Sequence, residues 1–175
     1  MIYLSLKKCG KTLSEQRAST KELMSDMLIS LGYNDDIQQK DDKGRPFLQC
    51  DNGDVSVSHC PELCAVAVLT ENLSDSDFSL VIPQSGQRIG IDIEEIPEKG
   101  DIARYTRIAK RFLNTDVETA DDFLRAWTRK EAYGKMVGDG LFSKPGIPCH
   151  YLTFTVESNN KRYILTISVK QRIPT

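Results

Sequence analysis

The sequence predicts an α+β fold of two similar α/β halves with antiparallel sheets, because the order strand, helix and hairpin occurs twice along the chain. Three observations support this prediction. Isoleucine alternates with other residues over 89–94, which is typical of a strand buried on one face. Every fourth residue from Phe123 to Lys135 is aromatic or charged, which is typical of one helix face. The turn Ser158-Asn159-Asn160-Lys161 separates two β-prone runs near the C-terminus.

Hydrophobic patterning places the elements of each half in order. The first half is expected to contain a strand near Ile2 to Leu6, a helix from about Ser14 to Leu31, and strands at 46–48, 55–58 and 65–69. The second half is expected to contain the strand that starts at Ile89, two helices, and a hairpin of residues 152–156 and 163–169. Gly138-Asp139-Gly140 is expected to end the second of these helices.

Residues 70–88 join the two halves, and their polar stretches surround an apolar run from Phe78 to Ile82. Clusters of Ser, Asp and Gly interrupt regular structure, so we expect an extended hairpin or loop there. A chain of 175 residues is long enough to bury one core. We therefore expect an N-terminal half of residues 1–85 and a C-terminal half of residues 86–175 within one compact unit.

Composition argues against several classes of protein. The net charge of −2 argues against general affinity for nucleic acid. The longest apolar run, Leu63 to Leu69, is too short to cross a bilayer, and Met1-Ile2-Tyr3-Leu4 lacks the basic flank of a signal peptide. The five cysteines fit neither an even disulfide set nor a zinc spacing. We expect a cytoplasmic protein with reduced thiols and without a nucleic-acid or membrane partner.

Asp92 and Glu94 lie two residues apart in the strand that starts at Ile89, so both carboxylates project from the same side of that strand. At a separation of about 6.6 Å along the strand, the two side chains can tilt toward one hard cation. A strand that ends in Asp-x-Glu is more often a solvated strand end, and that interpretation also remains open.

Phe123, Trp127, Glu131 and Lys135 form one stripe along the second helix, apolar at its start and charged at its end. Such a stripe suits a helix that leaves a core and enters a cleft. Alternatively, Glu131 and Lys135 form a surface ion pair, which contributes roughly a few tenths of a kcal/mol.

Together the two segments resemble the signature of the 4′-phosphopantetheinyl transferase superfamily, which is (Ile/Val)-Gly-(Ile/Val)-Asp-(Ile/Val)-Glu followed by Trp-x-x-Lys-Glu-(Ala/Ser)-x-x-Lys. Residues 89–94 match the first part and residues 127–135 match the second. Two further family elements are similar to Gly44-Arg45-Pro46 and to Ser58-His59. The four elements occur in family order and span residues 44–135.

The resemblance implies a surfactin-type enzyme, with two halves in one chain that are related by a pseudo-twofold, the cofactor in the cleft between them, and a monomeric state. The implied activity is that of a holo-acyl-carrier-protein synthase. It moves the 4′-phosphopantetheine group of coenzyme A to a serine of an apo acyl or peptidyl carrier protein and releases 3′,5′-ADP. Mg²⁺ is the implied cofactor, and Asp92, Glu94 and Glu131 are its implied protein ligands.

The resemblance also implies contacts with coenzyme A, residue by residue. Lys135 and Lys130 resemble the cations that face the phosphates, and Lys135 is the better candidate for the diphosphate. A lysine acts there as a point charge. His59, with Ser58 beside it, resembles a phosphate contact, and Arg45 resembles a contact for the adenosine end.

Two roles keep alternatives open. Larger family members hold the 3′-phosphate with basic residues in the N-terminal part, where this chain offers Arg17 and Lys21, although a solvated helix face explains these two equally well. The family places the general base after a basic-aromatic segment, where Asp116 or Glu118 fits. Glu118 alternatively closes a capping box with Thr115. A water molecule on the metal is a further candidate base.

The helix expected from about 101 to 113 has a basic face formed by Arg104, Arg107, Lys110 and Arg111. Carrier proteins are acidic, so this face suits carrier docking, and an ordinary solvated helix face is the alternative. Two rival functions remain for the whole chain. One is a catalytically silent module that binds coenzyme A or a carrier protein, and the other is a metal-dependent hydrolase of phosphate esters.

Overall fold

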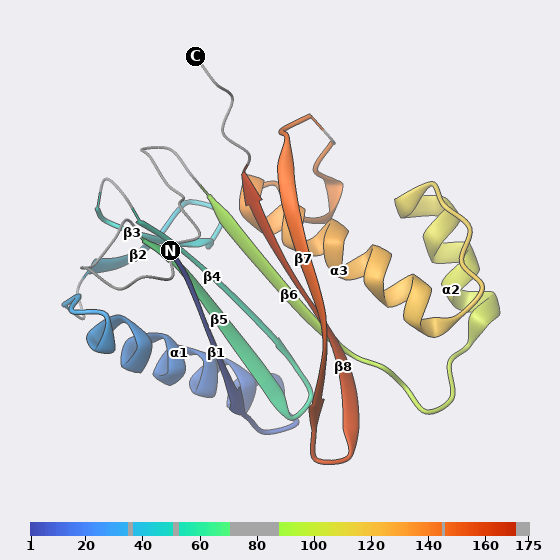
Figure 1. The fold of residues 1–175 in the computed structure, drawn as a ribbon, viewed down its shortest axis with the longest axis horizontal. Coiled ribbons are helices and arrows are strands. Elements are labelled where there is room, and N and C mark those ends of the chain that lie inside the picture. Colours follow the sequence, from blue (N-terminus) through green and yellow to red (C-terminus); the bar gives the residue numbers. More distant parts are fainter. Residues whose placement is uncertain (35–36, 51–52, 71–87, 145, 171–175) are drawn as a thin grey trace.

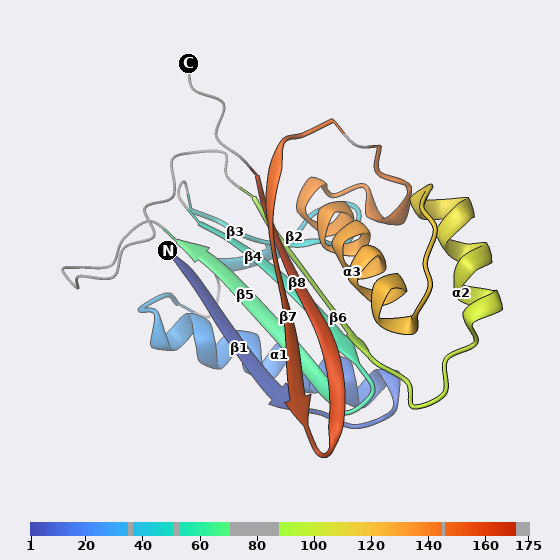
Figure 2. The ribbon, with the colours of Figure 1, turned by 45° about the vertical axis from the view of Figure 1, so that its right-hand side comes forward.

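The computed structural model covers residues 1–175 and describes all of them except 35–36, 51–52, 71–87, 145 and 171–175 (Figure 1). The described residues form four layers, in the order helix α1 (Leu13–Ser30), a first three-stranded sheet, a second three-stranded sheet, and helix α3 (Ala120–Val137) (Figures 1 and 2). The predicted α+β class with antiparallel sheets is confirmed. Most of the joining segment 70–88 and the expected boundary after residue 85 lie outside the described residues.

The first sheet contains the strands of the N-terminal half. They are β1 (Ile2–Lys8), β4 (Gly53–Cys60) and β5 (Leu63–Thr70), in the order β1-β5-β4. Successive side chains of β5 point to opposite faces of the sheet. Val66 and Val68 therefore pack against α1, while Ala65 and Ala67 face the second sheet. A short hairpin of β2 (Gln38–Lys40) and β3 (Pro46–Leu48) lies between α1 and β4 in the chain.

The second sheet contains the strands of the C-terminal half. They are β6 (Ile89–Glu95), β7 (Cys149–Ser158) and β8 (Lys161–Lys170), in the order β6-β8-β7. Helix α2 (Ile102–Ile108) continues as a π-helical segment, Ala109–Leu113, and a 3₁₀ turn, Gly140–Phe142, follows α3. In both sheets the first strand of the half pairs with the last strand, which takes the central position. This shared order agrees with two similar halves, and the pseudo-twofold relation between them stays a prediction.

The main hydrophobic core lies between the two sheets. It is formed by buried side chains of β5, β6 and β8, among them Leu69, Ile91 and Leu165. These residues alternate along their strands, so each strand contributes one face to the core. Among the described residues, no helix combines the length and the apolar character that crossing a membrane requires.

Helix α3 packs against the far face of β6 and β8, and it begins and ends with clear signals. Thr119 is the N-cap and forms a capping box with Asp122. Gly138 is the C-cap in the left-handed region, at φ 83°, as the glycine pattern predicts. The alternative capping box of Thr115 with Glu118 is therefore wrong, because the N-cap lies four residues after Thr115.

Gly90 is where β6 and α3 come closest. A Cβ atom on Gly90 would lie 1.9 Å from the carbonyl oxygen of Ala132 and 2.6 Å from the amide nitrogen of Met136. Both neighbouring atoms belong to the backbone of α3, so neither can rotate away. The absence of a side chain at this position allows the helix to lie directly on the strand that carries Asp92 and Glu94.

Candidate active site

The two halves meet where β4 runs beside β6, and side chains join them there. Alternate residues of β4 accept hydrogen bonds from alternate backbone N–H groups of β6, a contact that we call the β4–β6 seam. The pairs are Asp54 Oδ2 with Ile89 N–H (2.8 Å), Ser56 Oγ with Ile91 N–H (3.0 Å), and Ser58 Oγ with Ile93 N–H (3.3 Å). The two strands run parallel along the seam. Ser58 therefore lies next to Asp92 near their C-terminal ends.

Asp92 is buried, and its two carboxylate oxygens differ in their hydrogen bonding. The Oδ1 atom accepts hydrogen bonds from Ser58 Oγ at 2.9 Å and from Lys135 Nζ at 2.7 Å. The Oδ2 atom is buried and has no hydrogen-bond partner in the part of the chain that the structure describes. An orphaned anionic oxygen in the interior is unfavourable unless a cation meets it. Asp92 therefore fits one ligand position of a divalent metal.

Ser58 completes this arrangement through a fully used hydroxyl group. Its oxygen accepts from Ile93 N–H and from Lys135 Nζ at 2.8 Å, while its proton is donated to Asp92. A serine hydroxyl offers one donor and two acceptor positions, so all three are occupied. Ser58 thus holds the ends of β4, β6 and α3 together.

Glu94 and Glu131 lie in the same electrostatic field as Asp92. Burial, followed by repulsion from Asp92 and then from Glu131, raises the pKa of Glu94 to about 7, against an opposing effect of Lys135. Burial and then Asp92 also raise the pKa of Glu131, although Lys135 and Lys130 oppose the shift. Half-buried carboxylates that repel one another fit a site for a cation.

The metal ligand set of Asp92, Glu94 and Glu131 stays a prediction. Within the described ranges, no three carboxylate, histidine or cysteine side chains are already gathered around one point. Instead, the ammonium group of Lys135 neutralises Asp92 directly. The stripe predicted on α3 runs as expected from buried Phe123, through Trp127, to this charged end.

Replacing Glu94 with glutamine is expected to raise the free energy of unfolding by about 1–2 kcal/mol at pH 8 in the presence of a chelator. The Glu94 carboxyl has a pKa of about 7 in the folded chain, against 4.5 for an unperturbed group. Its favourable contribution is therefore complete below pH 4.5 and is lost as the pH rises through 7. Urea unfolding at pH 5 and pH 8 measures the difference, with the exposed Glu157→Gln as control. Parallel pH profiles for wild type and Glu94→Gln would refute this account.

A pocket of about 850 Å³ lies beside this cluster, between α1, the β2–β3 hairpin and β4. Several basic side chains line it together with two further residues of the β2–β3 hairpin, namely Arg17, Lys21, Lys40, His59, Gly44 and Pro46. Burial, and then the positive charges of Lys135 and Arg17, hold the pKa of His59 below its usual value. A pocket with this much positive charge suits an anion such as a phosphate ester.

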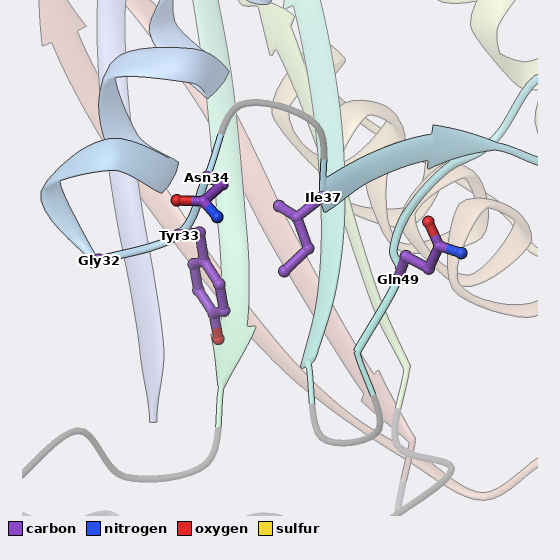
Figure 3. A pocket seen from close by; sticks show the side chains of 5 residues that line it. All are labelled: Gly32, Tyr33, Asn34, Ile37 and Gln49. Carbon is purple, nitrogen blue, oxygen red and sulfur yellow. The ribbon is translucent and has the colours of Figure 1, made fainter.

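The structure thus brings Arg17, Lys21 and His59 into one pocket, although they come from different elements. Lys40 was not among the predicted residues, because the three-residue strand that carries it shows no pattern in the sequence. A smaller hollow of about 390 Å³ lies at the end of α1 and is lined by Gly32, Tyr33, Asn34, Ile37 and Gln49 (Figure 3). These five described lining residues carry no charged side chain.

Arg45 lies between the pocket-lining residues Gly44 and Pro46, but its guanidinium group points into the interface between the two halves. It donates to the backbone oxygens of Lys135 at 2.8 Å and Ile89 at 3.3 Å. It also forms an ion pair with Asp54, and only 11 % of the Arg45 side chain is exposed. Its predicted contact with an adenosine group stays a prediction, and the structure adds a second role at the interface.

The remaining predicted residues lie on α3 and in the segment that precedes it. Lys130 is half-buried and its Nζ donates to the backbone oxygen of Ser143 at 2.5 Å. Asp116 is exposed and pairs with Lys110 at 3.5 Å. Glu118 is exposed directly before the cap residue Thr119. The choice between Asp116 and Glu118 as general base stays a prediction.

Sequence reasoning missed Asp54 and Ser56 as residues of the interface. The signal was present, because Asp54, Ser56 and Ser58 alternate with valines and must share one face of β4. That face points toward β6, where buried polar side chains need partners, and the backbone of β6 provides them.

Part of the chain is similar to a known protein family. Residues 88–167 match the model of the 4′-phosphopantetheinyl transferase superfamily. The matched segment contains both β6, with Asp92 and Glu94, and α3, with Glu131 and Lys135. A comparison with curated protein sequences finds no match.

Proposed function

We propose that this chain is a member of the 4′-phosphopantetheinyl transferase superfamily, whose model its residues 88–167 match, and that it transfers 4′-phosphopantetheine from coenzyme A to a serine of an apo acyl or peptidyl carrier protein. The reaction releases 3′,5′-ADP and requires Mg²⁺. An enzyme with this activity is a holo-acyl-carrier-protein synthase. The observation that carries the proposal is the buried, unpartnered Asp92 Oδ2 beside Lys135, next to a basic pocket. We assign the chain to the surfactin-type branch, as a monomer in the cytoplasm.

The chemistry makes three demands on the residues of the site. A serine oxygen attacks a phosphorus atom of the anionic diphosphate, so negative charge must be neutralised, the attack must be aligned, and a proton must be removed. Asp92, Glu94 and Glu131 would hold Mg²⁺, which supplies charge stabilisation to the diphosphate when bound. Lys135 and Lys130 add positive charge from α3.

The proton of the attacking serine needs an acceptor at the edge of this site. Asp116 and Glu118 are the proposed candidates, since both are exposed and lie in the segment that leads into α3. A carboxylate within hydrogen-bond reach of the serine hydroxyl can accept its proton as a general base.

The basic pocket suits the nucleotide end of coenzyme A. Arg17 and Lys21 lie one turn apart on α1 and face it together with His59. Two cations and an imidazole provide charge and hydrogen bonds for the 3′-phosphate and its neighbours. This placement supports the assignment of these three residues as cofactor contacts.

The carrier protein is proposed to dock on α2 and the π-helical segment that follows it. Arg104, Arg107, Lys110 and Arg111 are all exposed there. The carrier surface around the acceptor serine is acidic in this class of partner, so opposite charges would raise the association rate. High ionic strength is expected to reduce that contribution.

Replacing both Arg17 and Lys21 with alanine is expected to raise KM for coenzyme A about 10-fold or more, because two charge-assisted contacts with the 3′-phosphate are lost. The turnover number kcat should change little. Steady-state kinetics with coenzyme A and with 3′-dephospho-coenzyme A measures the effect, which should nearly vanish for the second substrate. The exposed Lys99→Ala is the control. An equal rise in KM for both substrates would remove these residues from the 3′-phosphate.

The proposed function is tested by the intact mass of apo carrier proteins after incubation with this protein, coenzyme A and Mg²⁺. Fatty-acid, polyketide and peptide-synthesis carriers are compared, each with a chelator control. The expected result is the gain of one phosphopantetheine group that the chelator abolishes. Binding of coenzyme A without transfer to any carrier would favour a catalytically silent module. Release of phosphate or nucleotide in the absence of a carrier would favour a hydrolase.

A further inference from the structure

The turn between β2 and β3 is held by several hydrogen bonds around Asp41, and Arg45 follows it. Asp41 Oδ1 accepts hydrogen bonds from the N–H groups of Lys43 at 3.0 Å and Arg45 at 2.8 Å. Gly44 adopts a φ of 80°, a conformation that favours glycine, and its N–H bonds to the Asp41 carbonyl at 2.8 Å. The side chain of Arg45 therefore leaves a fixed backbone.

The guanidinium group of Arg45 connects this turn to three other elements. Its Nε donates to the backbone oxygen of Lys135 in α3, and its Nη2 reaches both the Ile89 carbonyl of β6 and the carboxylate of Asp54 in β4. The same Asp54 oxygen accepts the N–H of Ile89. With 11 % of Arg45 and 6 % of Asp54 exposed, this pair is largely shielded from solvent.

The contact with Lys135 matters because of where it lies in the helix. Lys135 is in the last turn of α3, where carbonyl groups lack partners within the helix and the helix dipole attracts positive charge. Arg45 supplies both a donor and a charge to that carbonyl. The side chain of the same Lys135 donates to Asp92 and to Ser58. Lys135 thus connects Arg45 to the carboxylate cluster. The backbone carbonyl of Lys135 contacts Arg45, and the side chain of Lys135 contacts Asp92.

We propose that Arg45 and Asp54 form a clasp that positions Lys135 for phosphopantetheine transfer. Arg45 acts through Lys135, so it is a positioning residue. Because Gly44 and Pro46 line the basic pocket, a nucleotide held there rests on the turn from which the clasp extends. The clasp then couples the nucleotide end of the site to the end where Asp92 lies. The functional part of this inference rests on the proposed transferase activity.

Two roles of Arg45 make opposite predictions for kinetics. A contact with the adenosine group would contribute to binding, so its loss would raise KM for coenzyme A and weaken the binding of 3′,5′-ADP. A clasp would set the geometry of Lys135, so its loss would lower kcat and leave nucleotide affinity nearly unchanged. Arg45→Lys separates the two, because lysine keeps the charge opposite Asp54 but lacks the planar fork that also reaches the Lys135 carbonyl.

The first measurement is transfer kinetics with calorimetric binding of 3′,5′-ADP, on Arg45→Lys and on Asp54→Asn. Both variants are expected to lower kcat about 10-fold, with KM for coenzyme A and Kd for 3′,5′-ADP within about 2-fold of wild type. Lys43→Gln is the control, because it removes an exposed ion pair with Asp139 from the same turn and the same helix end. A rise in KM with kcat unchanged, or no change at all, would overturn the clasp.

A second measurement does not need catalysis. Native-state hydrogen exchange reports the amides of Gly138 and Asp139, which both bond to the Gly134 carbonyl at the end of α3. Exchange at these amides is expected to be about 5-fold faster or more in Arg45→Lys and unchanged in Lys43→Gln. Unchanged exchange in Arg45→Lys would overturn the clasp even if the wild type transfers. Wild-type protein that binds 3′,5′-ADP but modifies no carrier would instead overturn the proposed function.

Discussion

Glu131→Ala is expected to reduce transfer to carrier proteins about 10³-fold or more while leaving the fold intact, because a metal ion contributes several kcal/mol of charge stabilisation to such a reaction. Glu131 is half-buried on α3, and its strongest neighbouring charge is the carboxylate of Asp92. Removing a carboxylate from this field relieves repulsion, so thermal stability without metal should be equal to or greater than that of wild type.

The measurement compares the rate of carrier modification in Mg²⁺ with the unfolding curve in a chelator. Asp121, near the start of the same helix, pairs with Arg125 and lies far along the chain from the charged end. Asp121→Ala is therefore the matched control and should retain transfer. Turnover of Glu131→Ala close to that of wild type would remove Glu131 from the metal site and undermine the metal assignment.

Gly90→Ala is expected to lower the free energy of unfolding by about 3 kcal/mol or more, or to give insoluble protein. The new methyl group would overlap the backbone of α3 at Ala132 and Met136, and the helix would have to move away from β6. Such a movement also separates Lys135 from Asp92, so any folded fraction should transfer poorly.

Urea unfolding with the yield of soluble protein measures this effect. Gly146→Ala is the control, because a Cβ atom there would meet nothing within 4 Å. The control should change stability by only a few tenths of a kcal/mol. A stable and active Gly90→Ala variant would show that α3 can shift on β6 without loss of the site.

The regular elements could be predicted because each follows a strong local pattern. The helix expected from Ser14 to Leu31 is observed as Leu13–Ser30, and the closing hairpin has its turn at Asn159 and Asn160. The strand Gln38–Lys40 was missed, because a three-residue polar strand is stabilised by its neighbour and carries no periodic signal. The π-helical geometry of residues 109–113 was also missed, because no proline or glycine marks the change within the expected helix.

The site was predictable only where its residues share one element. The period of β6 indicates that Asp92 and Glu94 lie on one side, and the period of α3 places Glu131 near Lys135. The bond of Ser58 to Asp92 joins residues 34 positions apart, and no local pattern contains it. Arg45 shows the limit most clearly, because the Gly-Arg-Pro motif does not indicate into which cavity or interface the side chain turns.

The β4–β6 seam also has a consequence for solubility. Among the described strands, β6 forms backbone pairs with β8 alone, and its isoleucines would make its other edge a template for adding strands of further chains. Asp54, Ser56 and Ser58 occupy the N–H groups of that edge, and Asp54 brings a buried charge that an incoming strand would have to displace. The contact that joins the halves thereby also protects this strand edge from pairing with other chains.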